Sequence, residues 1–127
     1  MKLEDLTTKA LSGFIGGQLE IQNRSEEYLY RGEIARAYIE GDNLKVRFAW
    51  QAKMEGGEWH IAEGLDYVLT LWFDREKNQP LCAVQRLSDG RLMIRGASVF
   101  VAEVLTFFPP NGDKLDPAKV RGLVPAS

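Results

Sequence analysis

The stretch that decides the fold reads LKVRFAWQAKM and spans residues 44–54. Apolar side chains occupy its even positions, and mostly polar side chains occupy its odd positions. The even set is Leu44, Val46, Phe48, Trp50, Ala52 and Met54. A period of two is typical of a β-strand that packs one face against a core, whereas a helix would scatter both sets around its axis. We therefore expect the even face to be buried and the odd face to be largely exposed.

The residues before this stretch fit a partner strand. Ala35, Ala37 and Ile39 would share one face of an extended chain, and residues 41–43 read Gly-Asp-Asn, which favours a turn. A two-residue loop at 42–43 would give the pairs Ile39–Val46, Ala37–Phe48 and Ala35–Trp50. Small side chains would then lie opposite large ones, and a four-residue loop would keep the same faces.

A second hairpin is indicated by Gly56-Gly57, which separates two alternating runs. The expected cross-strand pairs are Trp59–Met54 and Ile61–Ala52. In this register Phe48, Trp50 and Trp59 would point to the same side of one three-stranded meander. The alternation thus predicts an aromatic group on a single face of the sheet.

The rest of the chain alternates short apolar stretches with turn residues. Residues 3–12 carry apolar side chains at helical spacing, which predicts a short helix within an N-terminal helical segment, 1–16. Segment 98–108 is compatible with a helix, but its β-branched and aromatic residues favour a strand. A C-terminal tail is expected over 111–127. Further strands are expected over 18–22, 67–73, 80–87 and 91–95.

About eight short strands at hairpin spacing predict a mainly β chain that forms a single domain over residues 1–127. We expect an antiparallel up-and-down meander that forms a small closed or nearly closed β-barrel with a short N-terminal helix; a β-sandwich is the alternative. The architecture is similar to that of lipocalin-type barrels. Those proteins commonly carry Gly-x-Trp at the first strand, whereas residues 13–15 and 17–19 read Gly-Phe-Ile and Gly-Gln-Leu.

Composition argues against several classes of protein. The 16 basic and 18 acidic residues are mixed along the chain without a basic block, so nucleic-acid binding is not expected. The single cysteine, Cys82, cannot form an internal disulfide, and its apolar neighbours predict a small buried side chain. Charged residues interrupt the N-terminal region, and no apolar stretch is long enough for membrane insertion. We expect a cytoplasmic protein.

Candidate ligand-binding residues come from the face that would line the barrel. An eight-stranded barrel is just wide enough to be filled by side chains or to hold one small ligand. Its aromatic residues would form plain core or line a cavity for an apolar or planar ligand. An inward carboxylate would contact the head group of the ligand, or would be solvated at one end of the barrel. The candidate set is Glu33, Phe48, Trp50, Trp59 and Tyr67.

Two predicted strands, 67–73 and 98–108, are apolar on both faces. A single core cannot lie on both sides of one sheet, and monomers rarely leave a large apolar patch open. Either the terminal segments or a second copy of the chain would cover the outer face. In the second case a two-fold homodimer is expected. Its candidate interface residues are Val68, Trp72, Phe100 and Val104.

The sequence contains few patterns that carry chemistry. His60 and Glu63 have the spacing of a helical metal site, but on a strand they would point to opposite faces, so no metal site is predicted. We find no nucleophile elbow and no phosphate-binding glycine loop, and we predict neither catalytic residues nor a cofactor. Binding of a small, largely apolar ligand inside the barrel ranks first. A homo-oligomeric interaction module ranks second, and a barrel enzyme using Glu33 or Glu63 ranks last.

Overall fold

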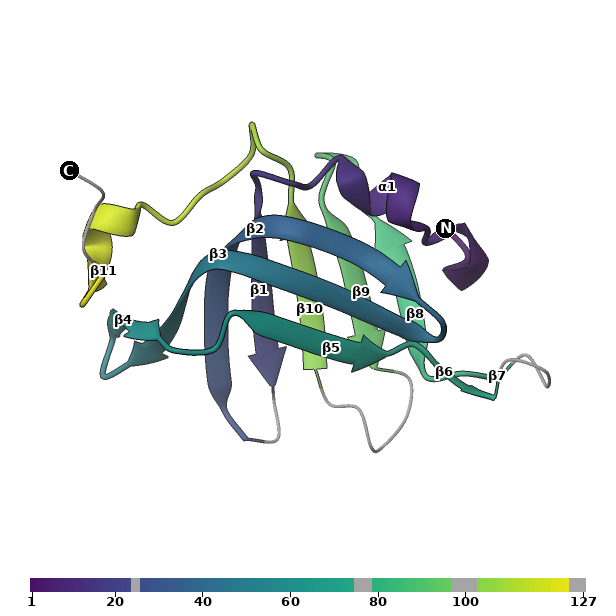
Figure 1. Cartoon of the computed structure of the whole chain (residues 1–127), viewed down its shortest axis with the longest axis horizontal. Coiled ribbons are helices and arrows are strands. Elements are labelled where there is room, and N and C mark those ends of the chain that lie inside the picture. Colours follow the sequence, from purple (N-terminus) through teal and green to yellow (C-terminus); the bar gives the residue numbers. More distant parts are fainter. Residues whose placement is uncertain (24–25, 75–78, 97–102, 124–127) are drawn as a thin grey trace.

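Nine strands form one curved sheet in the computed structural model, which describes residues 1–23, 26–74, 79–96 and 103–123 (Figure 1). The elements are η1 (Leu3–Asp5), α1 (Thr8–Ser12), β1 (Gln18–Asn23), β2 (Tyr28–Glu40), β3 (Asn43–Glu55), β4 (Glu58–Ala62), β5 (Asp66–Thr70), β6 (Trp72–Asp74), β7 (Gln79–Pro80), β8 (Cys82–Arg86), β9 (Leu92–Gly96), β10 (Glu103–Phe108), η2 (Pro117–Lys119) and β11 (Val120–Arg121). The chain is therefore mainly β. None of the helices in these ranges is both long and apolar enough to cross a membrane.

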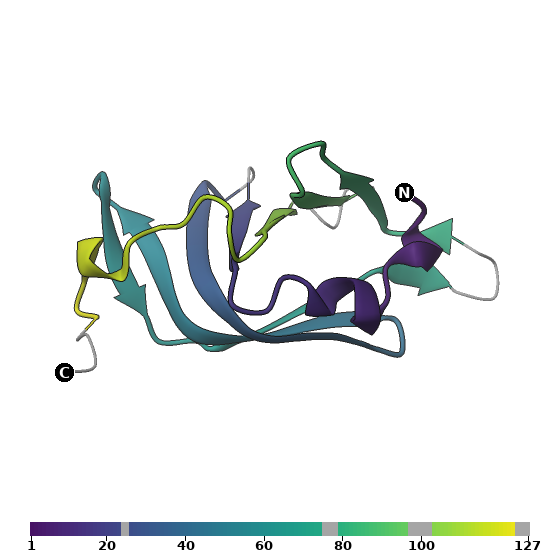
Figure 2. The same ribbon diagram turned by 90° about the horizontal axis from the view of Figure 1, so that it is seen from above.

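The sheet follows an antiparallel meander in the order β11-β4-β3-β2-β1-β10-β9-β8, and β5 pairs with the first half of β3. Strand β10 returns to pair with β1, and β11 adds to β4 in parallel. Seen from above, the sheet curves into an open trough (Figure 2). In the described part of the chain no strand pairing joins β5 to β8, so the sheet is not closed and the predicted barrel is not confirmed. Leu81 N donates a hydrogen bond to Leu71 O (2.9 Å) in the connection between them.

The main core fills the inside of the trough. Its most buried side chains come from β1, β2, β3, β9 and β10 and include Leu19, Ile34, Phe48, Ile94 and Phe107. The N-terminal segment adds Leu11 and Phe14, and the Phe14 ring lies 5.6 Å from that of Phe107. The predicted helix over 3–12 is divided into η1 and α1, because Thr7 adopts an extended backbone and caps α1 through Ala10 N (3.2 Å).

The first hairpin has a register different from the expected one. Its loop is Gly41-Asp42 and not 42–43, so that Ile39 lies opposite Leu44 and Ala37 opposite Val46. Gly41 has a φ of +60°, a conformation that glycine adopts at little cost and that suits a two-residue hairpin loop. The second hairpin has the predicted register, with the pairs Met54–Trp59 and Ala52–Ile61.

A bulge at Ala49 divides β3 into two halves with opposite facing. Phe48 lies opposite Ile34 and Trp50 lies opposite Glu33, so within the fully described β2–β3 pair Ala49 has no directly opposite residue. One extra residue shifts the alternation by one position, as β-bulges do. Phe48 consequently packs in the main core, whereas Trp50 lies on the other face of the sheet. The expectation that all even positions share one face is wrong beyond the bulge.

Gly32 makes room for this bulge from the neighbouring strand. A Cβ atom at this position would lie 2.6 Å from the Phe48 ring and 2.6 Å from the Trp50 carbonyl oxygen. Real Cβ atoms do not approach other atoms so closely, so a larger residue would force the ring or the backbone to move. The sequence thus provides a glycine where the bulged strand comes closest to β2.

A second apolar cluster forms on the outer face of the sheet. It contains Trp50, Ala52 and Val120, with Trp59, Leu115 and Leu123 packed at its edge. Leu115, Val120 and Leu123 belong to the C-terminal segment, which runs past this part of the sheet to the pairing of β11 with β4 (Figure 2). Nearby, Arg31 donates to Gln18 Oε1 (2.9 Å) and to Asp113 O (3.1 Å). The tail therefore covers part of the second apolar face.

Candidate functional site

The candidate site is a pocket of about 370 Å³, which we call the mouth pocket. Two elements that line it, the start of β2 and the β4–β5 connection, lie on the side of the sheet away from α1 (Figure 1). Strands β1 to β5 and the β4–β5 connection contribute its walls. Its lining residues are Ile21, Tyr28, Tyr30, Gln51, Ala62, Glu63, Gly64, Asp66 and Tyr67. The pocket is thus formed where the packed interior gives way to polar and aromatic side chains.

Two tyrosine hydroxyls from opposite sides of the trough converge on one carboxylate. Tyr28 OH donates a hydrogen bond to Glu103 Oε1, and Tyr67 OH donates to Glu103 Oε2. The three side chains come from β2, β5 and β10, so this cluster links strands that are far apart in the sheet order. It holds both tyrosine rings in place at the wall of the mouth pocket.

Both tyrosines are held in their neutral form. Burial, and then the hydrogen bond to Glu103, raises the pKa of Tyr28 to about 12. The same two causes, in the same order, raise the pKa of Tyr67 well above its ordinary value of 10.0. Neutral tyrosines beside an anionic oxygen act as hydrogen-bond donors and not as proton acceptors. Since each hydroxyl donates its single proton to Glu103, the cluster offers a ligand aromatic surface and hydroxyl oxygens that accept hydrogen bonds, with no base among its tyrosines.

Gln51 is the polar residue that the bulge turns toward the pocket. It lies opposite Gly32 on β2 and Ala62 on β4, on the same face as Tyr30, and it retains only 9% of its exposure. Within the described ranges its amide forms no hydrogen bond to another residue. The residue as a whole is buried, but its amide atoms are not sealed from solvent, so they are free to bind a ligand or water at the pocket.

The carboxylate of Glu63 and aromatic surface border the rim of the mouth pocket. Glu63 is exposed at the rim and forms no ion pair with a described residue. Asp66 accepts a hydrogen bond from Arg47 (2.6 Å). The rings of Tyr28 and Tyr30 meet edge to face at 5.1 Å. Such surroundings favour a ligand that is neutral or positively charged over an anion.

The structure does not gather the five predicted ligand-binding residues into one pocket. Tyr67 lines the mouth pocket, whereas Phe48 is 2% exposed in the main core. Trp50 and Trp59 lie together in the second apolar cluster, and Glu33 is half-buried opposite Trp50 on that outer face. The separation follows from the bulge at Ala49, which sequence periodicity does not reveal.

The predicted interface residues also occupy different environments. Val68 is 54% exposed on the outer face of β5, as expected. Trp72 is 7% exposed and belongs to the main core, because β5 ends at Thr70 and the chain turns inward at Leu71 before β6 begins. The exposed face assigned to Trp72 was wrong. Val104 is half-buried on β10, and Phe100 lies outside the described residues.

Two further groups bear on chemistry near the site. Cys82 is buried as predicted; burial, and then the charge of Glu103, raises the pKa of its thiol to about 11, so the thiol is neutral at pH 7. Across the described ranges, no three His, Cys, Asp or Glu side chains are grouped closely enough to hold a metal ion. The two residues of the H-x-x-E spacing do not lie on a helix, since His60 lies within β4 and Glu63 follows its end.

No protein-family model, curated protein or solved structure matches the chain. Its function is therefore inferred from the geometry of its own residues.

Proposed function

We propose that this protein binds a small ligand in the mouth pocket and does not transform it. The ligand is largely apolar where it meets Ile21 and the tyrosine rings, and it carries one neutral or cationic hydrogen-bonding group. The observation that carries the proposal is the Gln51 amide, which has no hydrogen-bond partner among the described residues and whose polar atoms are not sealed from solvent in the wall of a pocket of about 370 Å³. Pockets of this size that combine apolar walls with a few fixed polar groups are typical of ligand sites.

The packing of the trough favours the mouth over the interior as the place of binding. Phe48, Phe107 and Leu105 fill the space beneath the sheet and are almost completely buried. Leu11 and Phe14 fill the end next to α1. A ligand in the interior would have to displace these side chains, whereas the mouth pocket is already open.

The titratable groups near the pocket favour binding over catalysis. The raised pKa values of Tyr28, Tyr67 and Cys82 keep these groups neutral, and a nucleophile or general base needs the opposite shift. Glu63 lies at the exposed rim, without the burial that tunes a catalytic carboxyl group. The Gln51 amide and the fixed tyrosine rings instead suit recognition.

Two-dimensional amide NMR with a matched ligand series tests this function. Benzylamine, benzyl alcohol and benzoate share one ring and differ in their polar group. We expect benzylamine and benzyl alcohol to shift the amides of Tyr30, Gln51 and Ala62, and benzoate to bind more weakly. Gln51→Leu should weaken binding about tenfold, as expected for the loss of one hydrogen bond.

The matched control for this experiment is Gln85→Leu, which changes an exposed glutamine on β8. Binding should be unchanged in this variant. If a broad set of small neutral and cationic compounds shifts no amide around the mouth pocket, the proposed function is wrong. The same conclusion follows if Gln51→Leu and Gln85→Leu behave alike.

A further inference from the structure

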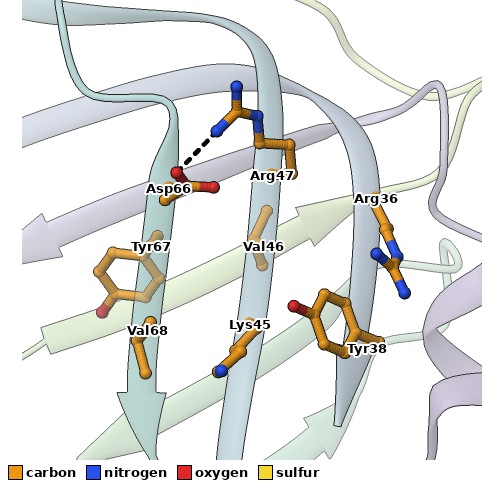
Figure 3. A pocket seen from close by; sticks show the side chains of 8 residues that line it. All are labelled: Arg36, Tyr38, Lys45, Val46, Arg47, Asp66, Tyr67 and Val68. Atoms are coloured by element: carbon orange, nitrogen blue, oxygen red, sulfur yellow. Dashed lines mark hydrogen bonds and ion pairs between the residues drawn. The ribbon is translucent and has the colours of Figure 1, made fainter. Parts of the chain in front are cut away.

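A second pocket, of about 440 Å³, lies on the outer face of β2, β3 and β5 (Figure 3). We call it the outer pocket. Figure 3 shows its side chains projecting from three adjacent strands. They are Arg36, Tyr38, Lys45, Val46, Arg47, Asp66, Tyr67 and Val68. The outer pocket shares Asp66 and Tyr67 with the mouth pocket, but the proposal below rests on Arg36, Lys45 and Arg47, which line the outer pocket and not the mouth pocket.

Positive charge is concentrated in the outer pocket by the pairing of the strands. Arg36 lies directly opposite Arg47, and Lys45 is the next outward residue along β3. Like charges at directly opposite positions of a sheet destabilise it. The lining contains one carboxylate, Asp66, against these three cations. An anion bound between the strands would offset this repulsion.

Arg36 is the cation that remains available for a ligand. Arg47 is paired with Asp66 (2.6 Å) and Lys45 with Glu40 (3.1 Å), whereas Arg36 forms no ion pair with a described residue. Its guanidinium group lies 4.3 Å from the centre of the Tyr38 ring. This contact orients the planar guanidinium group, which can then donate two parallel hydrogen bonds to one oxyanion.

Apolar and aromatic surface borders the cations. Val68, which is 54% exposed, lies on β5 on one side of Lys45, and Tyr38 lies on β2 on the other (Figure 3). Lys45 is opposite both Tyr38 and Val68 in the sheet. A ligand with its anionic group at Arg36 therefore has a place for an apolar or aromatic substituent.

We propose that the outer pocket binds a small phosphate monoester with an apolar or aromatic substituent, held by Arg36 with the support of Lys45 and Arg47. A phosphate group supplies an anionic partner for Arg36, the one of these three cations without an ion pair to a described residue, and arginine is the preferred partner for oxyanions of this geometry. The volume of the pocket is in the range of small-molecule sites. Because the cations are partly exposed, the affinity falls as salt is added.

Amide NMR with phenyl phosphate, inorganic phosphate and phenol tests this site. Phenyl phosphate should shift the amides of Arg36, Lys45 and Val68 at constant ionic strength, and it should bind more tightly than either of its parts. Arg36→Gln, which keeps a polar side chain but removes the charge, should weaken phenyl phosphate binding about tenfold. A dispersed spectrum of this variant shows that its fold is retained.

The matched control is Arg95→Gln on β9, which changes an exposed arginine outside the pocket. This variant should bind phenyl phosphate as the wild type does. Equal losses in the Arg36 and Arg95 variants would show nonspecific ionic attraction and overturn the proposal. Binding of inorganic phosphate as tightly as phenyl phosphate would overturn the role of Tyr38 and Val68. A lack of shifts around Arg36 would overturn the site itself.

Discussion

The two halves of β3 have the same alternation of apolar and polar residues, but their apolar side chains are buried on opposite faces of the sheet. In residues 44–48 the apolar side chains face the inside of the trough and are buried in the main core. In residues 50–54 the apolar side chains of Trp50 and Ala52 face outward and are covered by the C-terminal segment. One unpaired residue, Ala49, separates the two behaviours. The comparison shows that a bulge can divide one amphipathic strand between two clusters without a break in its pattern.

The bulge also determines the chemistry at the end of the trough. With regular pairing, Gln51 would share the outward face with Lys45 and Arg47. Because the alternation shifts at Ala49, Gln51 faces inward beside Tyr30 and lines the mouth pocket. The same shift that moves an aromatic residue out of the core therefore brings a polar residue into the mouth pocket.

The largest expected effect comes from the first half of β3. Phe48→Ala removes a ring from the centre of the main core and leaves a cavity, so it should lower the free energy of unfolding by about 3–5 kcal/mol. Urea denaturation followed by circular dichroism measures this loss. A loss below about 1 kcal/mol would mean that Phe48 is not enclosed as described.

The next effect tests the contact between the bulged strand and β2. Gly32→Ala places a Cβ atom against the Phe48 ring and the Trp50 carbonyl oxygen, and should cost about 1–3 kcal/mol. Gly64→Ala is the matched control, because a Cβ atom there meets nothing within 4 Å. Equal midpoints of urea denaturation for the two variants would contradict the close approach at Gly32.

A smaller effect is expected in the second apolar cluster. Val120→Ala removes two methyl groups from the residue that the tail packs against Trp50 and Ala52, and should cost about 1–2 kcal/mol. Tryptophan emission should also move to longer wavelength as water reaches Trp50. Emission identical to that of the wild type would show that the tail does not cover this face.

The smallest effect at neutral pH concerns the tyrosine–glutamate cluster. The folded pKa values of Tyr28 and Tyr67 lie above the unfolded value, so the folded state keeps these protons when the unfolded state begins to lose them. Their stabilisation is complete below the unfolded pKa of about 10 and is lost as the pH rises further. Urea denaturation should therefore show stability falling above about pH 10.

Tyr67→Phe separates the contribution of one hydroxyl group from that of general alkaline unfolding. This variant lacks one of the two protons, so its stability should fall less steeply above about pH 10 than that of the wild type. At neutral pH the lost hydrogen bond should cost about 1 kcal/mol. Identical alkaline slopes for the two proteins would contradict the burial of the Tyr67 hydroxyl group.

The strands and the second hairpin follow from the sequence because they depend on local signals. Alternation over 44–48 and the glycine pair at 56–57 each point to one structure, and the structure confirms both. The sequence does not predict that segment 67–73 is divided between β5 and β6. Both of its faces are apolar, so the alternation does not indicate where β5 ends. Trp72 was therefore placed on the wrong face.

Most of the candidate site could not be predicted from periodicity. Tyr67 was identified because its alternation with Val68 is regular within β5. Gln51 was missed because its inward orientation depends on the bulge. Two signals were present in retrospect: Ala49 is an apolar residue on the otherwise polar face, and Gly32 lies on the neighbouring strand. Neither indicates a bulge until the register of β2 against β3 is known.

The most direct test is the nuclear Overhauser pattern of the Trp50 indole ring. If the bulge at Ala49 places Trp50 and Gln51 as described, the ring protons of Trp50 will show contacts to the methyl groups of Val120. The ring protons of Phe48 will instead show contacts to main-core residues such as Ile34. Contacts from Trp50 to the same core residues as Phe48 would mean that the alternation is unbroken, and would contradict both the second cluster and the inward position of Gln51.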